Sequence, residues 1–320
     1  MIVSGILLTA AGVALGAFLV TAALSPLETL SWWAGWTEDE LEDDENGYDD
    51  APLQPDESIA AYIVYLSGVA SISGQYLLPR EKSFIRGLRK ELPAVAVIAD
   101  VFPYSPAGLP LLAAPRLFDR LWRRVQTVKI QGKRSLLAFL INIRNIFQVM
   151  VAADHRYGPI FGQGAGNAIG GALLKAGYQP GSRAPVYIIG YSGGAQVAVN
   201  AAPFLQAKLS CPISVISIGG VMASDPGLSV ISTLHHIRGD GDRVEKTGAL
   251  LFAERWRIFA TSPWNMARRE NRIKIHKIKN MIHAGPRGYF GLVPINGTPN
   301  NIRTQTIVRD IIVDNDFTTN

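Results

Sequence analysis

The pentapeptide Gly190-Tyr191-Ser192-Gly193-Gly194 constrains the fold more than any other segment of this chain. It follows the apolar run Val186 to Ile189, which is typical of a buried strand, and precedes the helix-like segment Ala195 to Leu205. A turn from a strand directly into a helix brings the two backbones close together, so the positions two before and two after the serine tolerate little more than hydrogen. Glycine occupies both positions. The sequence therefore predicts a strand-turn-helix unit that presents the hydroxyl of Ser192 at the end of the strand.

Two backbone amides near this turn are candidates for holding a negative charge. The turn leaves the amide of Gly193 free to face a developing oxyanion. A second amide is expected from the loop after the first strand of the body, Tyr65 to Ala70, where Gly68 allows the chain to turn. We expect the amide of Val69 to be this second donor.

Strands and helices alternate along the rest of the chain. Strands are expected at Ala60 to Leu66, Ala94 to Val101, Val186 to Ile189, Ile213 to Ile218, Leu234 to Arg238 and Arg272 to Ile278. Helices are expected at Glu81 to Lys90, Ala195 to Lys208 and Ile302 to Val313. This alternation predicts an α/β fold with a mostly parallel, doubly wound sheet and helices on both faces.

A serine hydroxyl is a poor nucleophile at neutral pH, so it needs a base within hydrogen-bond reach, and an acid must orient that base. Two aspartates, Asp240 and Asp242, lie on a glycine-containing loop directly after the strand Leu234 to Arg238. The carboxyl end of a parallel strand is where such sites are built. We favour Asp242 because its Gly-x-x-Asp-x-Val spacing looks like the acid loop of many hydrolases. Asp240, and Asp225 in the loop after the preceding strand, remain alternatives.

The candidate base is His283, in the loop after the last predicted strand and before the final helix. It comes last in the order Ser, Asp, His along the chain. The other four histidines are expected to be structural: His276 lies inside a strand, the neighbours His235 and His236 point to opposite faces of another strand, and His155 lies near a helix end.

With these motifs, in this order, the chain resembles the serine hydrolases of the α/β-hydrolase fold over roughly Ala60 to Val313. The resemblance implies a mechanism in which Ser192 attacks, His283 transfers the proton and Asp242 orients the imidazole. It implies an ester, thioester or related acyl substrate and no cofactor. Many relatives carry His-Gly where this chain has Ser67-Gly68.

The chain is also similar to uncharacterised membrane-anchored hydrolase-like proteins of photosynthetic bacteria, through Arg156 to Ile160, Gly177 to Gly181 and Ile189 to Gly194. This second similarity implies no substrate. The alternative interpretation of the chain is a non-catalytic hydrolase-like module that binds a ligand or partner at the membrane.

A membrane segment is predicted at the N-terminus. Ile2 to Leu24 carries no charge over 23 residues, which at about 1.5 Å per residue is enough to cross the roughly 30 Å hydrocarbon core. Trp32, Trp33 and Trp36 follow at interfacial depth. A cleaved signal peptide is the competing interpretation, but the start lacks a positive region and the stretch exceeds the usual ~7–15 apolar residues. We therefore expect an anchor and interfacial segment over 1–36 and a single-pass membrane protein. The absence of flanking basic residues leaves the side of the body unassigned.

The remaining sequence divides into an acidic linker and a basic body. Residues 37–58 are rich in Asp, Glu and Pro and cannot bury enough apolar surface to offset their ordering entropy, so a disordered spacer is expected. The body, 59–320, holds all 31 basic residues but only 14 of the 26 acidic ones. The interval between Val101 and Val186 is too long for one crossover helix, so we expect an inserted helical cap near 102–160. Within it, Pro115 to Val128 combines a basic and an apolar face, which suits an anionic membrane surface; a solvated helix packed on the body is the alternative interpretation.

Other ligand classes find no support in the sequence. The run Gly162 to Gly171 lacks the G-x-G-x-x-G spacing and a following acidic residue, so it predicts a small-residue helix face packed close to the sheet. Cys211 is the only cysteine and is expected to be buried. No residue pattern indicates a metal or a nucleic acid. A small-molecule or lipid acyl substrate is the expected ligand.

Overall fold

The computed structural model describes scattered residues between Thr9 and Ala34, and then residues 59–71, 77–105, 136–295 and 297–317. No helix among them combines the length and the apolar character that crossing a bilayer requires. Most of the predicted anchor, the whole acidic linker and the predicted basic helix at 115–128 lie outside the described residues. Those three assignments, and the boundaries of the linker and cap, stay predictions.

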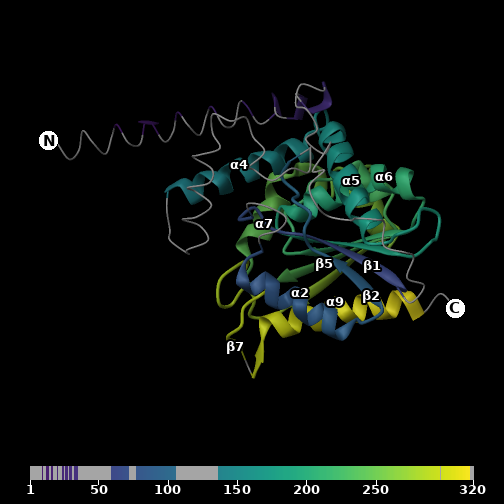
Figure 1. Cartoon of the computed structure of the whole chain (residues 1–320). Coiled ribbons are helices and arrows are strands. Elements are labelled where there is room, and N and C mark those ends of the chain that lie inside the picture. The colour runs from purple at the N-terminus through teal and green to yellow at the C-terminus, as the bar shows by residue number, and fades with distance from the viewer. Residues whose placement is uncertain are drawn as a thin grey trace, which may run out of the picture.

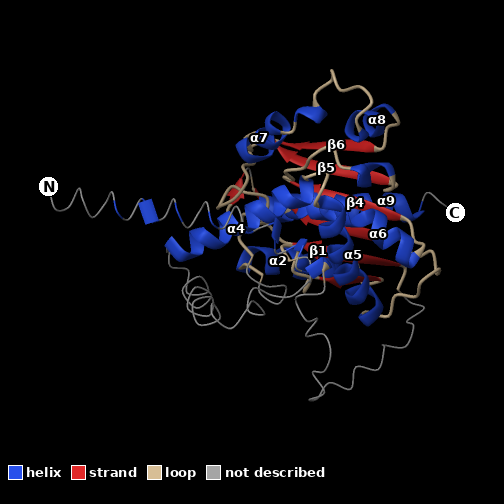
Figure 2. Ribbon diagram, turned by 90° about the horizontal axis from the view of Figure 1, so that it is seen from above, coloured by secondary structure: helices blue, strands red, loops and turns tan. Residues whose placement is uncertain are grey.

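A six-stranded parallel sheet forms the centre of the body, in the order β2-β1-β3-β4-β5-β6. Its strands are β1 (Ala61–Leu66), β2 (Val95–Ile98), β3 (Val186–Tyr191), β4 (Ile213–Ile218), β5 (Thr233–Gly239) and β6 (Ile273–Ile278). The predicted parallel α/β architecture is confirmed, and the largest error among the strands is at β2, which ends at Ile98 and not at the predicted Val101. Figure 2 shows the strands side by side, with α5 and α6 lying across them.

Helices cover both faces of this sheet (Figure 1). The helices are α2 (Pro79–Glu91), α4 (Leu136–Ala153), α5 (Gly158–Lys175), α6 (Gly194–Leu209), α7 (Arg243–Leu251), α8 (Pro263–Arg269) and α9 (Asn300–Phe317). The described elements also include two short 3-10 helices, η2 (Pro226–Ser229) and η3 (Ala253–Arg255). Two small strands, β7 (Pro294–Ile295) and β8 (Thr298–Pro299), form a separate hairpin pair. Side chains of β1 alternate between two cores: Val64 and Leu66 face α5 and α6, whereas Ile63 and Tyr65 face α2 and α9. Burial on both faces explains why these strands are almost continuously apolar.

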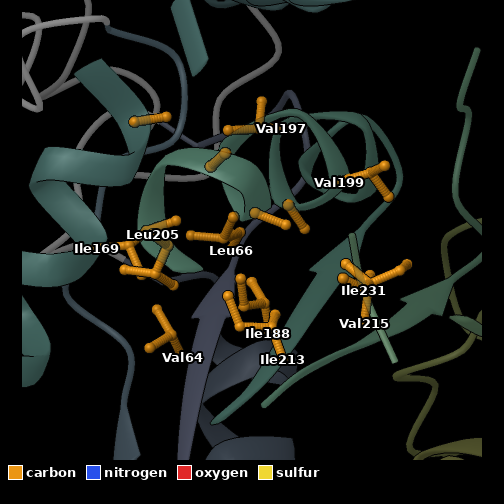
Figure 3. Packing of buried hydrophobic residues seen from close by; sticks show 14 of the residues in the cluster. Val64, Leu66, Ile169, Ile188, Val197, Val199, Leu205, Ile213, Val215 and Ile231 are labelled. Carbon is orange, nitrogen blue, oxygen red and sulfur yellow. The ribbon is translucent and has the colours of Figure 1, made fainter. Parts of the chain in front are cut away.

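The glycine-rich run forms α5, and its small face packs on α6 rather than on the sheet. A methyl group built on Gly162 would lie 2.6 Å from the carbonyl oxygen of Asn200, and one built on Gly166 would lie 2.9 Å from Cβ of Phe204. The prediction that this face packs on the sheet is therefore wrong, because the face packs on α6. The sheet is instead contacted by the larger residues of α5, such as Ile169, which lies beside Val64 and Leu205 in Figure 3. Glycines one turn apart let two helix backbones approach closely, and this fixes α6 above the sheet.

The strand order places a topological switch point between β1 and β3. From β1 the chain moves outward to β2, and then returns through α4 and α5 to pair β3 on the other side of β1. The loops that follow β1 and β3 therefore diverge, and ligands of open parallel sheets bind at such a point. Ser67 to Val69 and Ser192 lie in these two loops.

Candidate active site

The serine turn has the geometry that its glycines predict. Ser192 lies between β3 and α6 with a backbone φ of 54°, a left-handed conformation that non-glycine residues seldom adopt. A methyl group on Gly190 would lie 2.4 Å from Cα of Ala195, and one on Gly194 would lie 2.6 Å from the carbonyl oxygen of Leu66. The turn is thus closed to larger side chains at both positions. The close packing of the turn keeps Ser192 in this strained conformation, with its hydroxyl above the end of the sheet.

Three side chains that are far apart in the sequence meet above this turn. Nε2 of His283 lies 2.9 Å from Oγ of Ser192, and Nδ1 of the same ring lies 2.9 Å from Oδ2 of Asp242. An ionised carboxylate can only accept hydrogen bonds, so the ring proton is on Nδ1 and Nε2 is left to accept the serine hydroxyl. The structure therefore brings together a hydroxyl, an imidazole and a carboxylate in the arrangement that acyl transfer requires.

The carboxylate of Asp242 is fully hydrogen-bonded. Oδ1 caps α7 by accepting the amides of Val244 and Glu245 at 2.9 and 3.0 Å, and Oδ2 accepts the hydroxyl of Tyr289 at 2.8 Å in addition to His283. Burial alone raises the pKa of Asp242, but the hydrogen bond and charge of His283, with the cap and tyrosine bonds, outweigh it and hold the pKa below its ordinary value. Asp242 is thus ionised at neutral pH and fixed in direction.

The two alternative acids have other partners. Asp240 is exposed, and its side chain accepts only the distant amide of Met281 at 3.4 Å among the described residues. Asp225 caps η2 and accepts the side-chain amides of Gln196 and Asn200 at 2.8 and 3.2 Å. Neither carboxylate contacts His283, so the geometry favours Asp242.

Two tyrosines that the sequence did not single out position the acid and the base. Tyr289 accepts the amide of Gly239 at 2.8 Å while it donates to Asp242, which ties the acid to the end of β5. Tyr191 stacks on the ring of His283, with centroids 5.5 Å apart, and donates its hydroxyl to the carbonyl oxygen of the same residue at 2.8 Å. Burial raises the pKa of both phenols, so both remain donors.

Gly193 and the loop that carries Val69 lie next to each other beside Ser192. A methyl group built on Gly193 would lie 2.9 Å from Cγ1 of Val69, and within the described part of the chain neither amide donates to a protein acceptor. Asn145 of α4 fixes the loop by donating to the carbonyl oxygens of Val69 and Ser71, each at 2.8 Å. Two unengaged amides held in this way are suited to bind an oxyanion.

A mostly apolar cavity of about 300 Å³ opens beside the histidine. It lies between the start of α2 and the histidine loop, and its walls include Leu78, Tyr191, His283 and Phe290. Glu81 also lines it, and burial raises the pKa of its carboxyl to about 7 against the lowering effect of the Leu78 amide. The cavity can therefore take an apolar group beside His283 and Tyr191.

A second serine, histidine and carboxylate set lies deeper in the fold. Nδ1 of His236 is 3.0 Å from Oγ of Ser217, and its Nε2 is 3.1 Å from Glu245, which also pairs with Arg238 at 3.1 Å. Ser217, His236 and Glu245 have no exposed surface, so no substrate reaches them. This set anchors α7, which Asp242 caps.

The remaining histidines make structural contacts. His235 and His276 stack with nitrogen atoms 3.1 Å apart, and His155 bonds to Glu254 at 3.0 Å. Cys211 is buried as expected. Within the described ranges, no three His, Cys, Asp or Glu side chains gather as metal ligands do.

None of the protein-family models matches this chain, and no curated protein matches it. Among solved structures it is similar to a dienelactone hydrolase-like promiscuous phosphotriesterase from metagenomic libraries, at 13% identity over 83% of this chain and 90% of that chain, with a TM-score of 0.45. The parallel sheet with helices on both faces fits the expected α/β-hydrolase fold. The similarity to proteins of photosynthetic bacteria gains no support from these matches.

Proposed function

We propose that this chain is a serine hydrolase that cleaves an ester, thioester or related acyl bond through a covalent acyl-enzyme. The observation that carries this proposal is the continuous hydrogen-bonded chain from Ser192 through His283 to Asp242, at 2.9 Å for each link. The nearby amides of Gly193 and Val69 support it, since acyl transfer also needs donors for the oxyanion.

The proposed reaction proceeds in two halves. Oγ of Ser192 bonds to the substrate carbonyl carbon while its proton passes to Nε2 of His283, and the amides of Gly193 and Val69 hold the oxyanion. When the tetrahedral adduct collapses, the bond to the leaving alcohol or thiol breaks, and the leaving group takes the proton from His283. Water then attacks the acyl carbon, gives a proton to His283, and releases the acid as this proton returns to Ser192. Asp242 stays ionised throughout and stabilises the imidazolium.

The cavity beside His283 supports an acyl substrate with an apolar part. Leu78 and Phe290 offer carbon surface in the cavity that Tyr191 and His283 also line, and burying apolar surface contributes about 25 cal/mol per Å². A chain-length series of p-nitrophenyl esters identifies the preferred group.

Labelling with a fluorophosphonate tests the assignment without a known substrate. The purified full-length chain is expected to acquire one adduct, which peptide mapping places on Ser192 and not on the buried Ser217. Ser192→Ala, checked for folding by circular dichroism, is expected to remain unlabelled. A folded wild-type chain that does not react would favour a non-catalytic module that binds a ligand or partner at the membrane.

We also propose that the chain is held at a membrane by its N-terminal segment. The uncharged stretch Ile2 to Leu24 and the following tryptophans support this. Carbonate washing of membranes should leave the full-length chain in the pellet. Release of the full-length chain into the supernatant would contradict the anchor but not the hydrolase.

A further inference from the structure

Large apolar side chains protrude from the last turn of α7 and from the segment that links α7 to α8. Ile258 is 78% exposed, Leu250 69% and Leu251 65%, and Trp256 and Phe259 are each more than 40% exposed. Single exposed apolar residues are ordinary on protein surfaces, but five within ten residues form a patch of the kind that marks an interaction site. We call this patch, together with the exposed basic residues around it, the α7–α8 surface; its basic residues are Arg243, Lys246, Arg257, Arg268 and Arg269.

The backbone of this segment is held firmly from inside. The side-chain amide of Asn265 donates to the carbonyl oxygens of Trp256 and Phe259 at 2.8 and 3.0 Å. Arg255 turns inward, where it donates to the carbonyl oxygen of Met222 at 3.1 Å and lies 3.9 Å over the ring of Trp264. The apolar side chains are therefore presented to solvent by a fixed loop.

The charge of the α7–α8 surface is strongly positive. Three carboxylates occur between residues 243 and 270, and each one is paired; the exposed Asp240 lies just before α7, where its carbonyl oxygen accepts Lys246. Glu245 is buried against His236 and Arg238, Glu254 bonds to His155, and Glu270 pairs with Arg272 at 2.6 Å. The exposed basic residues therefore dominate the field in front of the apolar patch.

We propose that the α7–α8 surface docks on an anionic lipid bilayer. Apolar side chains surrounded by basic ones match the two layers that such a membrane offers, acyl carbon below and phosphate above. Trp256 contributes an exposed aromatic ring to the apolar patch, and its N–H donates to the carbonyl oxygen of Ala249 at 3.2 Å, which fixes the ring there. A second copy of the chain that packed the same surface against itself would cover the apolar patch but would oppose cations to cations. The proposal goes beyond the hydrolase and does not depend on the N-terminal anchor.

The test places a probe at the centre of the surface in the full-length chain. Ile258→Cys is labelled with an environment-sensitive fluorophore, and Val313→Cys on α9, across the sheet, is the matched control. The native Cys211 is buried, so the label goes to the introduced thiol. Each labelled chain is combined with vesicles of phosphatidylcholine alone or with added phosphatidylglycerol, and circular dichroism checks the fold.

The probe at position 258 is expected to shift to shorter wavelength in the anionic vesicles, and the probe at 313 is not. Salt at 1 M, where the Debye length is about 3 Å, should reverse most of the shift. Adding Arg257→Gln should lower the ratio of docked to undocked chain about fivefold. Equal shifts in neutral and anionic vesicles would overturn the proposal. A shift without vesicles that grows with chain concentration would also overturn it, because a second copy would then cover the surface.

Discussion

Replacing Asp242 by asparagine changes one atom in the proposed catalytic chain. The amide oxygen of Asn can still accept the two α7 amides that Oδ1 accepts now. The new NH₂ group then faces Nδ1 of His283 and the hydroxyl of Tyr289, both of which now donate to Oδ2. His283 must turn a lone pair toward this NH₂, so its proton moves to Nε2 and the ring can no longer accept the proton of Ser192.

The expected loss of rate is large because the substitution changes the tautomer of His283 in every molecule. In serine hydrolases with this arrangement, the corresponding change lowers the rate about 10,000-fold, which is about 5 kcal/mol of transition-state stabilisation. The second-order rate of fluorophosphonate labelling of the full-length chain measures it. Asp240→Asn is the matched control, because Asp240 lies on the same loop but is exposed, and its rate should stay within about twofold. A loss of less than tenfold for Asp242→Asn, or an equal loss for Asp240→Asn, would refute the assigned acid.

Asn145→Ala removes the two hydrogen bonds from α4 to the loop of Val69, so labelling should slow about 10- to 100-fold while the fold persists; an unchanged rate would show that Asn145 does not position the amide of Val69. Glu81 has a pKa of about 7 in the fold against 4.5 unfolded, so the folded chain keeps a proton that the unfolded chain releases, and stability falls by about 3 kcal/mol as the pH rises from 4.5 through 7. Glu81→Gln should flatten this slope in urea unfolding series at several pH values, and an equally steep slope in the variant would assign it to other groups. Gly162→Ala should destabilise the chain by about 1–3 kcal/mol, because its methyl group would meet a backbone carbonyl of α6 at 2.6 Å, whereas Gly171→Ala has open space and should be neutral or stabilising by up to about 1 kcal/mol. Equal effects in urea unfolding would contradict the proposed helix packing.

The parts of the fold that depend on local sequence were predictable. Glycine at positions 190 and 194, between an apolar run and a helix-like run, specifies the turn at Ser192 because only hydrogen fits against Ala195 and Leu66. The buried strands of a parallel sheet are also visible in sequence, since they are apolar on both faces.

Contacts between distant segments were not predictable. Asp240 and Asp242 both lie on the loop after β5, and only the packed position of His283, 41 residues beyond Asp242, separates them. Tyr289 bonds to Asp242, 47 residues before it, and Asn145 bonds to Val69, 76 residues before it. Nothing in the local sequence of Tyr289 or Asn145 indicates these contacts. The small face of α5 was assigned to the sheet because helix periodicity shows which residues share a face but not what that face meets.

The most direct test of the account is to observe the covalent intermediate itself. The full-length chain is mixed with a p-nitrophenyl ester, quenched in acid within the first turnover, and measured by intact-mass and peptide spectrometry. The account predicts a mass increase equal to one acyl group, located on Ser192 and absent in Ser192→Ala. Ester hydrolysis by the folded chain with the acyl group on another residue, or with equal turnover in Ser192→Ala, would contradict it.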